Sequence, residues 1–200
     1  MKPEHKDKIY TMLKARRGSF ADAALFDIME NLEPALARLI DYCGGDSQST
    51  GMKDTPGRVI KAWLELTQGY ESVPDDFLDV QFDIKENISQ KTKQPVTVKN
   101  IPVMSICEHH VLPFFGVASV TYTPKDKVVG LSKLAKLVQG YAKRFQIQEK
   151  LTEEIALAVE KKLGVEEVRV VIDAEHTCMT CRGAQALGSS TETDYHKKAE

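Results

Sequence analysis

Two short segments of this chain, far apart in the sequence, are dense in side chains that bind metal ions. The first is Cys107-Glu108-His109-His110, and the second runs from His176 to Cys181. Thiolate sulfur and imidazole nitrogen are the ligands that zinc prefers. If one ion takes ligands from both segments, the chain must fold so that residues 107 and 178 meet, which restricts the possible folds more than any other feature.

Within these segments we expect Cys107, His110 and Cys178 to be the ligands. Adjacent histidines on an extended backbone point to opposite sides, whereas residues three apart can converge on a turn. His109 is then left near the metal as a proton carrier. His176 should share a strand face with Cys178 and be a second proton carrier. Three protein ligands leave a fourth position for water, as a catalytic zinc requires.

Two other interpretations of the cysteines remain open on these residues alone. Cys178-Met179-Thr180-Cys181 is a C-x-x-C unit, so a closed structural zinc site could use Cys107, His110, Cys178 and Cys181. The same unit could be a redox dithiol, but the flanking pattern is not that of a thioredoxin-like βαβ unit. The dense clustering disfavours unrelated buried cysteines and histidines.

The hydrophobic pattern predicts strands that lead into both segments. Apolar residues mostly alternate over 96–106 and 114–122, which predicts an antiparallel pair with the first segment near its connection. Two helices should follow, one capped by Ser132 and carrying the apolar stripe Leu134 to Tyr141, the other over 151–163 and stopped by Gly164. A strand over 165–173 then leads to His176, and 185–193 is a candidate last strand.

The N-terminal part is predicted to be helical. Residues 1–20 are polar and basic and are expected to form a loosely held arm. Apolar residues recur at helical spacing over 22–42, with Pro34 as a kink or a break, and a second helix should begin with Thr55 as its N-cap. We therefore expect an α+β chain, with an arm and helices over 1–70 and a catalytic domain over 71–200, together one functional unit.

Composition excludes several classes of function. The 200 residues include 27 basic and 29 acidic side chains, a formal charge of −2, which does not favour binding to nucleic acid or to an anionic membrane. No apolar run approaches the roughly 18 residues needed to span a bilayer, and the N-terminus does not resemble a secretory signal. Four cysteines without such a signal indicate a reducing compartment, the cytoplasm.

Two further groups are typical of nucleotide binding, although each also has a simpler explanation. Ser132 and Lys133 at a helix start, with Lys136 one turn later, suit a phosphate group, but helix capping and solvated lysines are more common. Gln148 and Glu149 could bind the edge of a purine through an amide and a carboxylate. An exposed polar turn would give the same pattern.

Taken together, the motifs resemble one family. Cys107–His110, Gly130–Lys133, Gln146–Glu149 and His176–Gly183 occur in the order and spacing of GTP cyclohydrolase I, and Asp54–Val59 is similar to that family's N-terminal helix motif. The resemblance covers roughly residues 22–190. It implies the T-fold, an antiparallel sheet with two helices between strand pairs, preceded by helices. It also implies a toroidal homodecamer with active sites at subunit interfaces.

The resemblance implies hydrolysis and rearrangement of GTP to 7,8-dihydroneopterin triphosphate and formate. Cys107, His110 and Cys178 would hold Zn²⁺, and His109 and His176 would transfer protons. Gln148 and Glu149 would hold the guanine. The triphosphate would be bound by Ser132, Lys133, Lys136 and Arg182, with Arg58 a weaker candidate.

Two residues depart from the family pattern. Lys136 stands where arginine is common, which keeps the charge but loses the bidentate fork. Cys181 lies outside the family's zinc set.

Two hypotheses compete with this interpretation. One is another enzyme of the same fold, such as the nitrile reductase of queuosine synthesis. The other is a non-enzymatic assembly protein with a closed zinc site that includes Cys181.

Overall fold

The computed structural model describes residues 19–84 and 94–198, with side chains from residue 26. The basic arm expected over 1–20 lies almost entirely outside the described residues. The chain divides by its internal contacts into two compact units, Met1–Glu65 and Leu66–Glu200. The functional boundary expected at residue 70 stays a prediction.

Among the described residues, the first unit has the helices α2 (Ser19–Tyr42) and α3 (Thr55–Leu66). α2 contains Pro34 and is one helix rather than two. Gly44 follows it with φ 91°, a conformation that glycine adopts without steric cost. Thr55 was expected to cap α3 but is its first helical residue.

Arg58 has a structural role at the start of α3. Its Nη2 donates to the carbonyl of Gly51 and to the hydroxyl of Thr55, each at 2.8 Å. A cation in the first turn is unfavourable for the helix dipole. These two hydrogen bonds explain its presence there, because they fasten the preceding loop to the helix.

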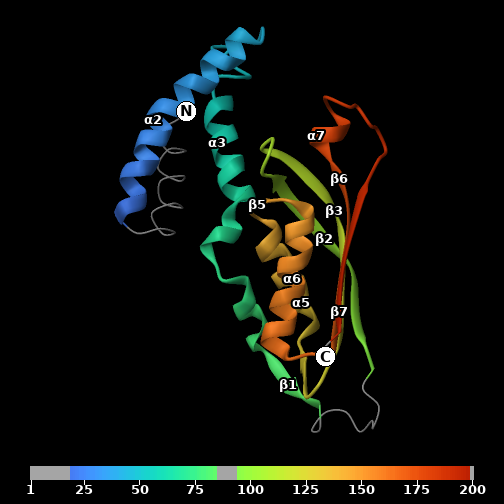
Figure 1. Ribbon diagram of the computed structural model, residues 1–200. Coiled ribbons are helices and arrows are strands. Elements are labelled where there is room, and N and C mark those ends of the chain that lie inside the picture. Colours follow the sequence, from blue (N-terminus) through green and yellow to red (C-terminus); the bar gives the residue numbers. More distant parts are fainter. Residues whose placement is uncertain (1–18, 85–93, 199–200) are drawn as a thin grey trace. The chain divides into compact units, whose positions relative to one another are not determined.

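The second unit is built on one five-stranded sheet, ordered β5-β2-β3-β6-β7 (Figure 1). The neighbours β2, β3, β6 and β7 are antiparallel, and β5 pairs in parallel with the end of β2. The bounds are β2 Val96–Cys107, β3 Leu112–Thr123, β5 Phe145–Gln146, β6 Glu167–His176 and β7 Thr191–Lys198.

Helices α5 (Leu131–Ala142) and α6 (Gln148–Leu163) cover one face of this sheet (Figure 1). Buried and more exposed residues alternate along β3 and β6, as in a sheet with one covered face. The core between the layers includes Phe114, Tyr122, Leu134, Leu137, Leu151, Ile155 and Ile172. The α+β class and the two helices between strand pairs, as in the T-fold, are confirmed.

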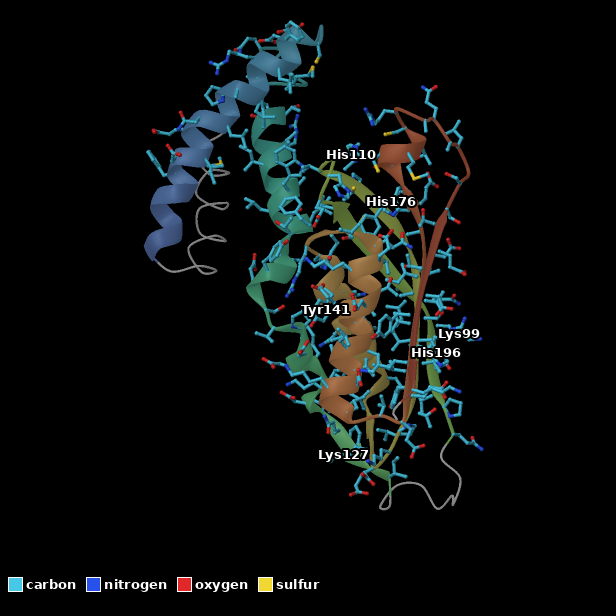
Figure 2. All side chains as sticks on the ribbon, in the orientation of Figure 1. Lys99, His110, Lys127, Tyr141, His176 and His196 are labelled. Carbon is cyan, nitrogen blue, oxygen red and sulfur yellow. The ribbon has the colours of Figure 1, made fainter. Side chains whose placement is uncertain are left out.

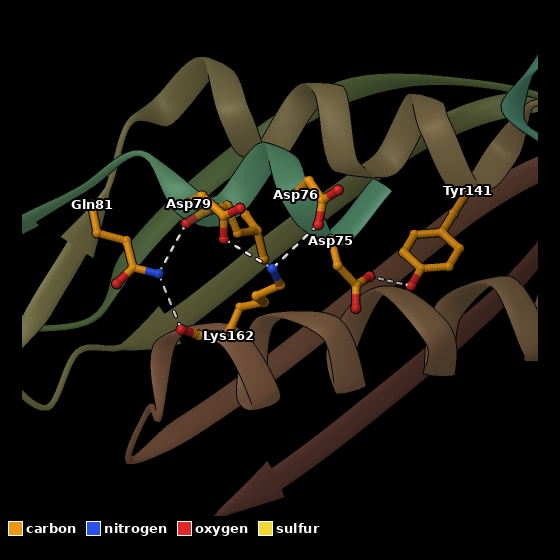
Figure 3. A network of polar contacts seen from close by, with 7 residues as sticks. Asp75, Asp76, Asp79, Gln81, Tyr141 and Lys162 are labelled. Carbon is orange, nitrogen blue, oxygen red and sulfur yellow. Dashed lines mark hydrogen bonds and ion pairs between the residues drawn. The ribbon is translucent and has the colours of Figure 1, made fainter. Parts of the chain in front are cut away.

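The second unit also contains short elements that precede or connect these layers. They are η1 (Gln68–Glu71), η2 (Pro74–Asp79), and the paired strands β1 (Gln81–Asp83) and β4 (Lys127–Val129). Polar contacts fasten η2 to both helices (Figure 3). Nζ of Lys162 on α6 lies 2.9 Å from Oδ1 of Asp79, and the hydroxyl of Tyr141 on α5 donates to the carboxylate of Asp75. Burial, together with the Asp75 carboxylate, raises the pKa of Tyr141. The phenol therefore stays a neutral donor in this clamp.

Several predicted bounds need correction. Ser132 does not cap α5, because Gly130 is the N-cap residue and Ser132 lies in the first turn. The last strand begins at Thr191, not at 185, because Gln185 and Gly188 have φ of 51° and 77° and cannot continue a strand. β4 and β5 were not predicted. The stop of α6 is confirmed, with Gly164 in the left-handed conformation.

Candidate metal centre and active site

The first ligand segment forms a tight turn between β2 and β3. Cys107 ends β2 and lies opposite Leu112, the first residue of β3. The N–H of Val111 donates to the Cys107 carbonyl at 2.9 Å, and Val111 has φ 54°, which is rare for a β-branched residue. This curvature brings Nδ1 of His110 to 3.8 Å from Sγ of Cys107.

The Val111 conformation leads to a stability prediction. Replacement by glycine should raise the free energy of unfolding by about 0.5–1 kcal/mol, because removing the left-handed strain outweighs the added chain entropy. The matched control is Val117→Gly on β3, where Val117 has a similar exposure of 43% against 38% but no positive φ. That control should lower stability by about 1 kcal/mol. Equal losses in thermal unfolding would contradict the strain argument.

The second ligand segment leaves the sheet at the same end. His176 ends β6 opposite Phe114, and the short helix α7 (Thr177–Thr180) follows. The Thr177 hydroxyl donates to the carbonyl of Pro113 at 2.6 Å, which ties α7 to the start of β3. Cys178 therefore lies on a helix, and the prediction that it shares a strand face with His176 is wrong.

These two segments bring three metal-ligating side chains together. The ligand atoms of Cys107, His110 and Cys178 all lie within 4.8 Å of one another. Tetrahedral zinc with Zn–N and Zn–S bonds of about 2.0–2.3 Å places its ligand atoms about 3.3–3.8 Å apart, so a small adjustment would close the site. Figure 2 shows His110 and His176 at the same end of the sheet. The donor set and its spacing fit a zinc ion.

Cys181 is not part of this group. It is exposed, and its Sγ donates to the carbonyl of Thr177 at 2.7 Å. In the described ranges the metal-ligating group that includes Cys178 has three members, which leaves the fourth position of a tetrahedral ion to a non-protein ligand. This geometry favours an open site over the closed site with four protein ligands.

Electrostatics also favour a cation at this position. Burial, and then the neighbouring Cys107, raise the pKa of the Cys178 thiol, while Arg182 opposes the shift. Two thiolates held this close repel each other, and a divalent cation between them would reverse that effect. All four cysteines are free thiols in the structure.

Two histidines lie beside the group without belonging to it. Nδ1 of His109 is 3.9 Å from Sγ of Cys107, and its side chain is exposed. The imidazole of His176 stacks on Phe114, with centroids 4.4 Å apart and planes inclined by 7°. Burial lowers the pKa of His176, and Glu149 partly opposes this. The lowered pKa favours the neutral form of this imidazole.

The start of α6 lies next to His176. Oε1 of Gln148 is 2.8 Å from Nε2 of His176, and the Gln148 side chain is buried. Glu149, the next residue, is exposed. Sequence reasoning expected both side chains to face a purine, but in the structure the amide of Gln148 is committed to contacts within the protein. Glu149 remains available to a ligand.

The expected phosphate-binding residues divide into two groups. Arg182 follows α7, close enough to influence the Cys178 thiol. Ser132, Lys133 and Lys136 lie on the first turns of α5, whose twelve residues extend about 18 Å. The other end of α5 leads to β5, which pairs with Cys107. Figure 2 places Lys127, on the strand before α5, at the end of the sheet opposite His110. Within one chain, Arg182 and the residues at the start of α5 therefore do not form one phosphate-binding site.

Sequence reasoning missed three contacts that position the site. They are the stacking of Phe114 on His176, the bond from Thr177 to the start of β3, and the bond between Gln148 and His176. Each joins segments that are distant in the sequence. Only the pairing register of β3 with β6 could have indicated the first, and hydrophobic alternation alone does not determine that register.

Comparisons with known proteins place the chain in a family. A family profile described as GTP cyclohydrolase I matches residues 32–199. GTP cyclohydrolase 1 of Carboxydothermus hydrogenoformans is 46% identical over 165 residues, covering 82% of this chain and 83% of that protein. The protein of the same name from Pelotomaculum thermopropionicum is 44% identical over 170 residues, covering 84% and 87%.

Among solved structures, an archaeosine synthase QueF-Like in the apo form aligns with a TM-score of 0.46 and 19% identity, over 55% of this chain and 99% of that one. Within the described ranges, no helix combines the length and apolar character needed to cross a membrane.

The profile match and the sequence identities, each spread over most of the chain, settle the family. The chain belongs to the GTP cyclohydrolase I family.

Proposed function

We propose that this protein is a zinc-dependent enzyme that opens the imidazole ring of GTP, releases formate and forms 7,8-dihydroneopterin triphosphate. One observation carries the proposal: Cys107, His110 and Cys178 form a group that could hold a metal ion, at the same end of the sheet as His109 and His176, in a chain of this family. The relatives' name, GTP cyclohydrolase 1, supports GTP as the substrate.

Cys107, His110 and Cys178 would hold the zinc. When bound, the ion supplies Lewis-acid activation of the water that attacks C8 of the guanine. The support is the donor set itself, since two thiolates and an imidazole are typical zinc ligands and Cys181 points back to Thr177 instead. With three protein ligands, a fourth position would stay open for water, which would distinguish this site from a structural one.

His109 and His176 would transfer protons during ring opening, rearrangement of the ribose and reclosure. His176 has Nε2 engaged by Gln148, so Nδ1 is the atom at which it would accept and return a proton. His109 is exposed beside Cys107 and can reach a ligand from the solvent side. Proton transfer by positioned imidazoles typically contributes about 10²–10⁴-fold to a rate.

Substrate binding would use both ends of the second unit. The carboxylate of Glu149 would accept hydrogen bonds from guanine N–H groups, and Gln148 would contribute through its backbone N–H in the first turn of α6. The triphosphate would be bound by Ser132, Lys133, Lys136 and Arg182, three cations and a hydroxyl that suit a highly charged anion.

A homo-oligomer, by family resemblance a decamer, would complete the site. Ser132 and Lys133 lie at the start of α5, and Lys136 near its middle, whereas the opposite end of α5 leads to the strand beside Cys107, so a neighbouring subunit would supply them to the site. The exposure of apolar side chains on the sheet supports assembly: within the described part of the chain, Met104, Phe115 and Val117 are exposed at 44%, 40% and 43%. The free thiols suit the reducing cytoplasm.

The direct test is incubation of the purified, zinc-loaded protein with GTP. Formate should be released, and oxidation of the product should yield pterin fluorescence. ATP, which has the same triphosphate but lacks the guanine edge, is the substrate control and should yield neither. If the zinc-loaded, assembled protein gave no formate from GTP, the proposal would be wrong. Formate without pterin would show that hydrolysis occurs but the later rearrangement does not.

A further inference from the structure

We infer that Gln148 is a positioning residue for His176. It would hold the imidazole with its proton on Nε2 and leave Nδ1 for the substrate. The consequence for turnover rests on the role proposed above for His176, whereas the orientation of the ring follows from hydrogen bonds alone. This role differs from the direct guanine contact that the sequence suggested for the Gln148 side chain.

The orientation of the Gln148 amide is determined by its surroundings. Its Nε2 donates to the carbonyls of Ile172 at 3.0 Å and Thr191 at 2.7 Å, and lies 3.2 Å from the hydroxyl of Thr193. Both carbonyls can only accept hydrogen bonds. A flipped amide would direct Oε1 at these oxygens and lose both bonds. Oε1 must therefore be the atom that faces His176.

This orientation determines which nitrogen of His176 carries a proton. Oε1 of Gln148 can only accept, so Nε2 of His176, 2.8 Å away, must be the donor. In the neutral ring Nδ1 is then the acceptor. The stacking on Phe114 keeps the imidazole plane parallel to a buried phenyl ring. No other hydrogen bond of this imidazole occurs among the described residues.

The Gln148 amide is buried and hydrogen-bonded within the protein, so it is not free to reorient toward a ligand. Gln148 is 1% exposed, and its partners come from two neighbouring strands, β6 and β7. Thr152 strengthens the cluster by donating to the backbone carbonyl of Gln148 at 2.8 Å and by pairing with the hydroxyl of Thr193 at 2.6 Å. A contact with guanine would require the side chain to leave these partners.

The first experiment uses the unmodified, zinc-loaded protein. Magic-angle-spinning NMR of sedimented protein labelled with ¹⁵N-histidine resolves the two ring nitrogens whatever the assembly size. The His176 signals, assigned by their loss in His176→Ala, should show a protonated Nε2 with a slowly exchanging, downfield proton. A proton on Nδ1 of the neutral ring, or an Nε2 proton that exchanges freely with solvent, would overturn the inference. This arm needs no GTP turnover.

The second experiment compares two substitutions in the same cluster. Gln148→Met keeps the length of the side chain but removes every hydrogen bond of its amide, including the one to His176. Thr152→Val removes a buried hydroxyl of the cluster and leaves the amide in place. Gln148→Met should lose the slowly exchanging Nε2 proton and about 10²-fold in kcat, since a small misplacement of a reacting group costs about that much. Its KM for GTP should change less than about threefold. Thr152→Val should retain the Nε2 proton and most of kcat.

The two measurements separate the possible explanations. A rise in KM with unchanged kcat in Gln148→Met would indicate a guanine contact and refute the positioning role. Equal effects of both substitutions on kcat and on the Nε2 proton would indicate that the cluster matters only for stability. If the unmodified protein did not turn over GTP, the proposed function would fail, but the NMR result would still decide the orientation of His176.

Discussion

Cys107→Ala should purify with less than about a tenth of the zinc of the unmodified protein and turn over GTP at least about 10³-fold more slowly. Losing an outer partner of a metal site typically costs about 10–100-fold, and Cys107 would be a direct ligand. It is also buried, at the end of β2, where the first ligand segment begins. Its removal would leave only His110 and Cys178 to hold the ion.

The matched control is Cys181→Ala, which changes the other thiol of the C-x-x-C unit. Cys181 is exposed and donates to Thr177, so this variant should keep one zinc per chain and most of the activity. Metal content by atomic emission and formate release would be measured on both variants. Zinc loss in Cys181→Ala equal to that in Cys107→Ala would show a closed four-ligand site and revive the structural-zinc hypothesis.

The main elements could be predicted because their hydrophobic periodicity is strong. Alternating apolar residues over 96–106 and 114–122 correspond to β2 and β3, and Gly164 marks the end of α6 as expected. The short strands β4 and β5 contain three and two residues, too few for any period to be detected. Their existence depends on partners that are distant in the sequence, namely β1 and the end of β2.

That Cys107, His110 and Cys178 form a group able to hold a metal could be predicted because the chemistry of the residue types is local. Cys107 and His110 are three residues apart on a turn, and their residue types alone indicate zinc. The partner of His176 could not be predicted in this way. Gln148 contacts His176 from the start of α6. The orientation of the Gln148 amide depends on one backbone carbonyl of β6 and one of β7. The predicted bounds of β7 were wrong. Such contacts follow from register and packing, which residue types do not specify.

Gly116→Ala should be the most destabilising single-methyl change in the sheet that supports the site. A Cβ at this position would lie 2.0 Å from the carbonyl oxygen of Asp173 and 2.5 Å from Cα of Ala174. Both contacts are with backbone of the neighbouring strand β6, so no side-chain rotation can relieve them. We expect the free energy of unfolding to fall by at least about 3 kcal/mol, lowering Tm by roughly 6–12 °C.

The same change should damage the candidate metal centre, because the turn with Cys107 and His110 leads into β3, and α7 with Cys178 follows β6. Gly116 pairs with Ala174, and two residues further along Phe114 pairs with His176. Separating the strands at Gly116 would move α7 and Cys178 away from Cys107, so zinc affinity should fall together with Tm. Gly51→Ala is the control, since no atom lies within 4 Å of its added Cβ, and Tm should stay within about 2 °C. If Gly116→Ala kept the parent Tm, β3 and β6 could not pair as closely as the structure requires.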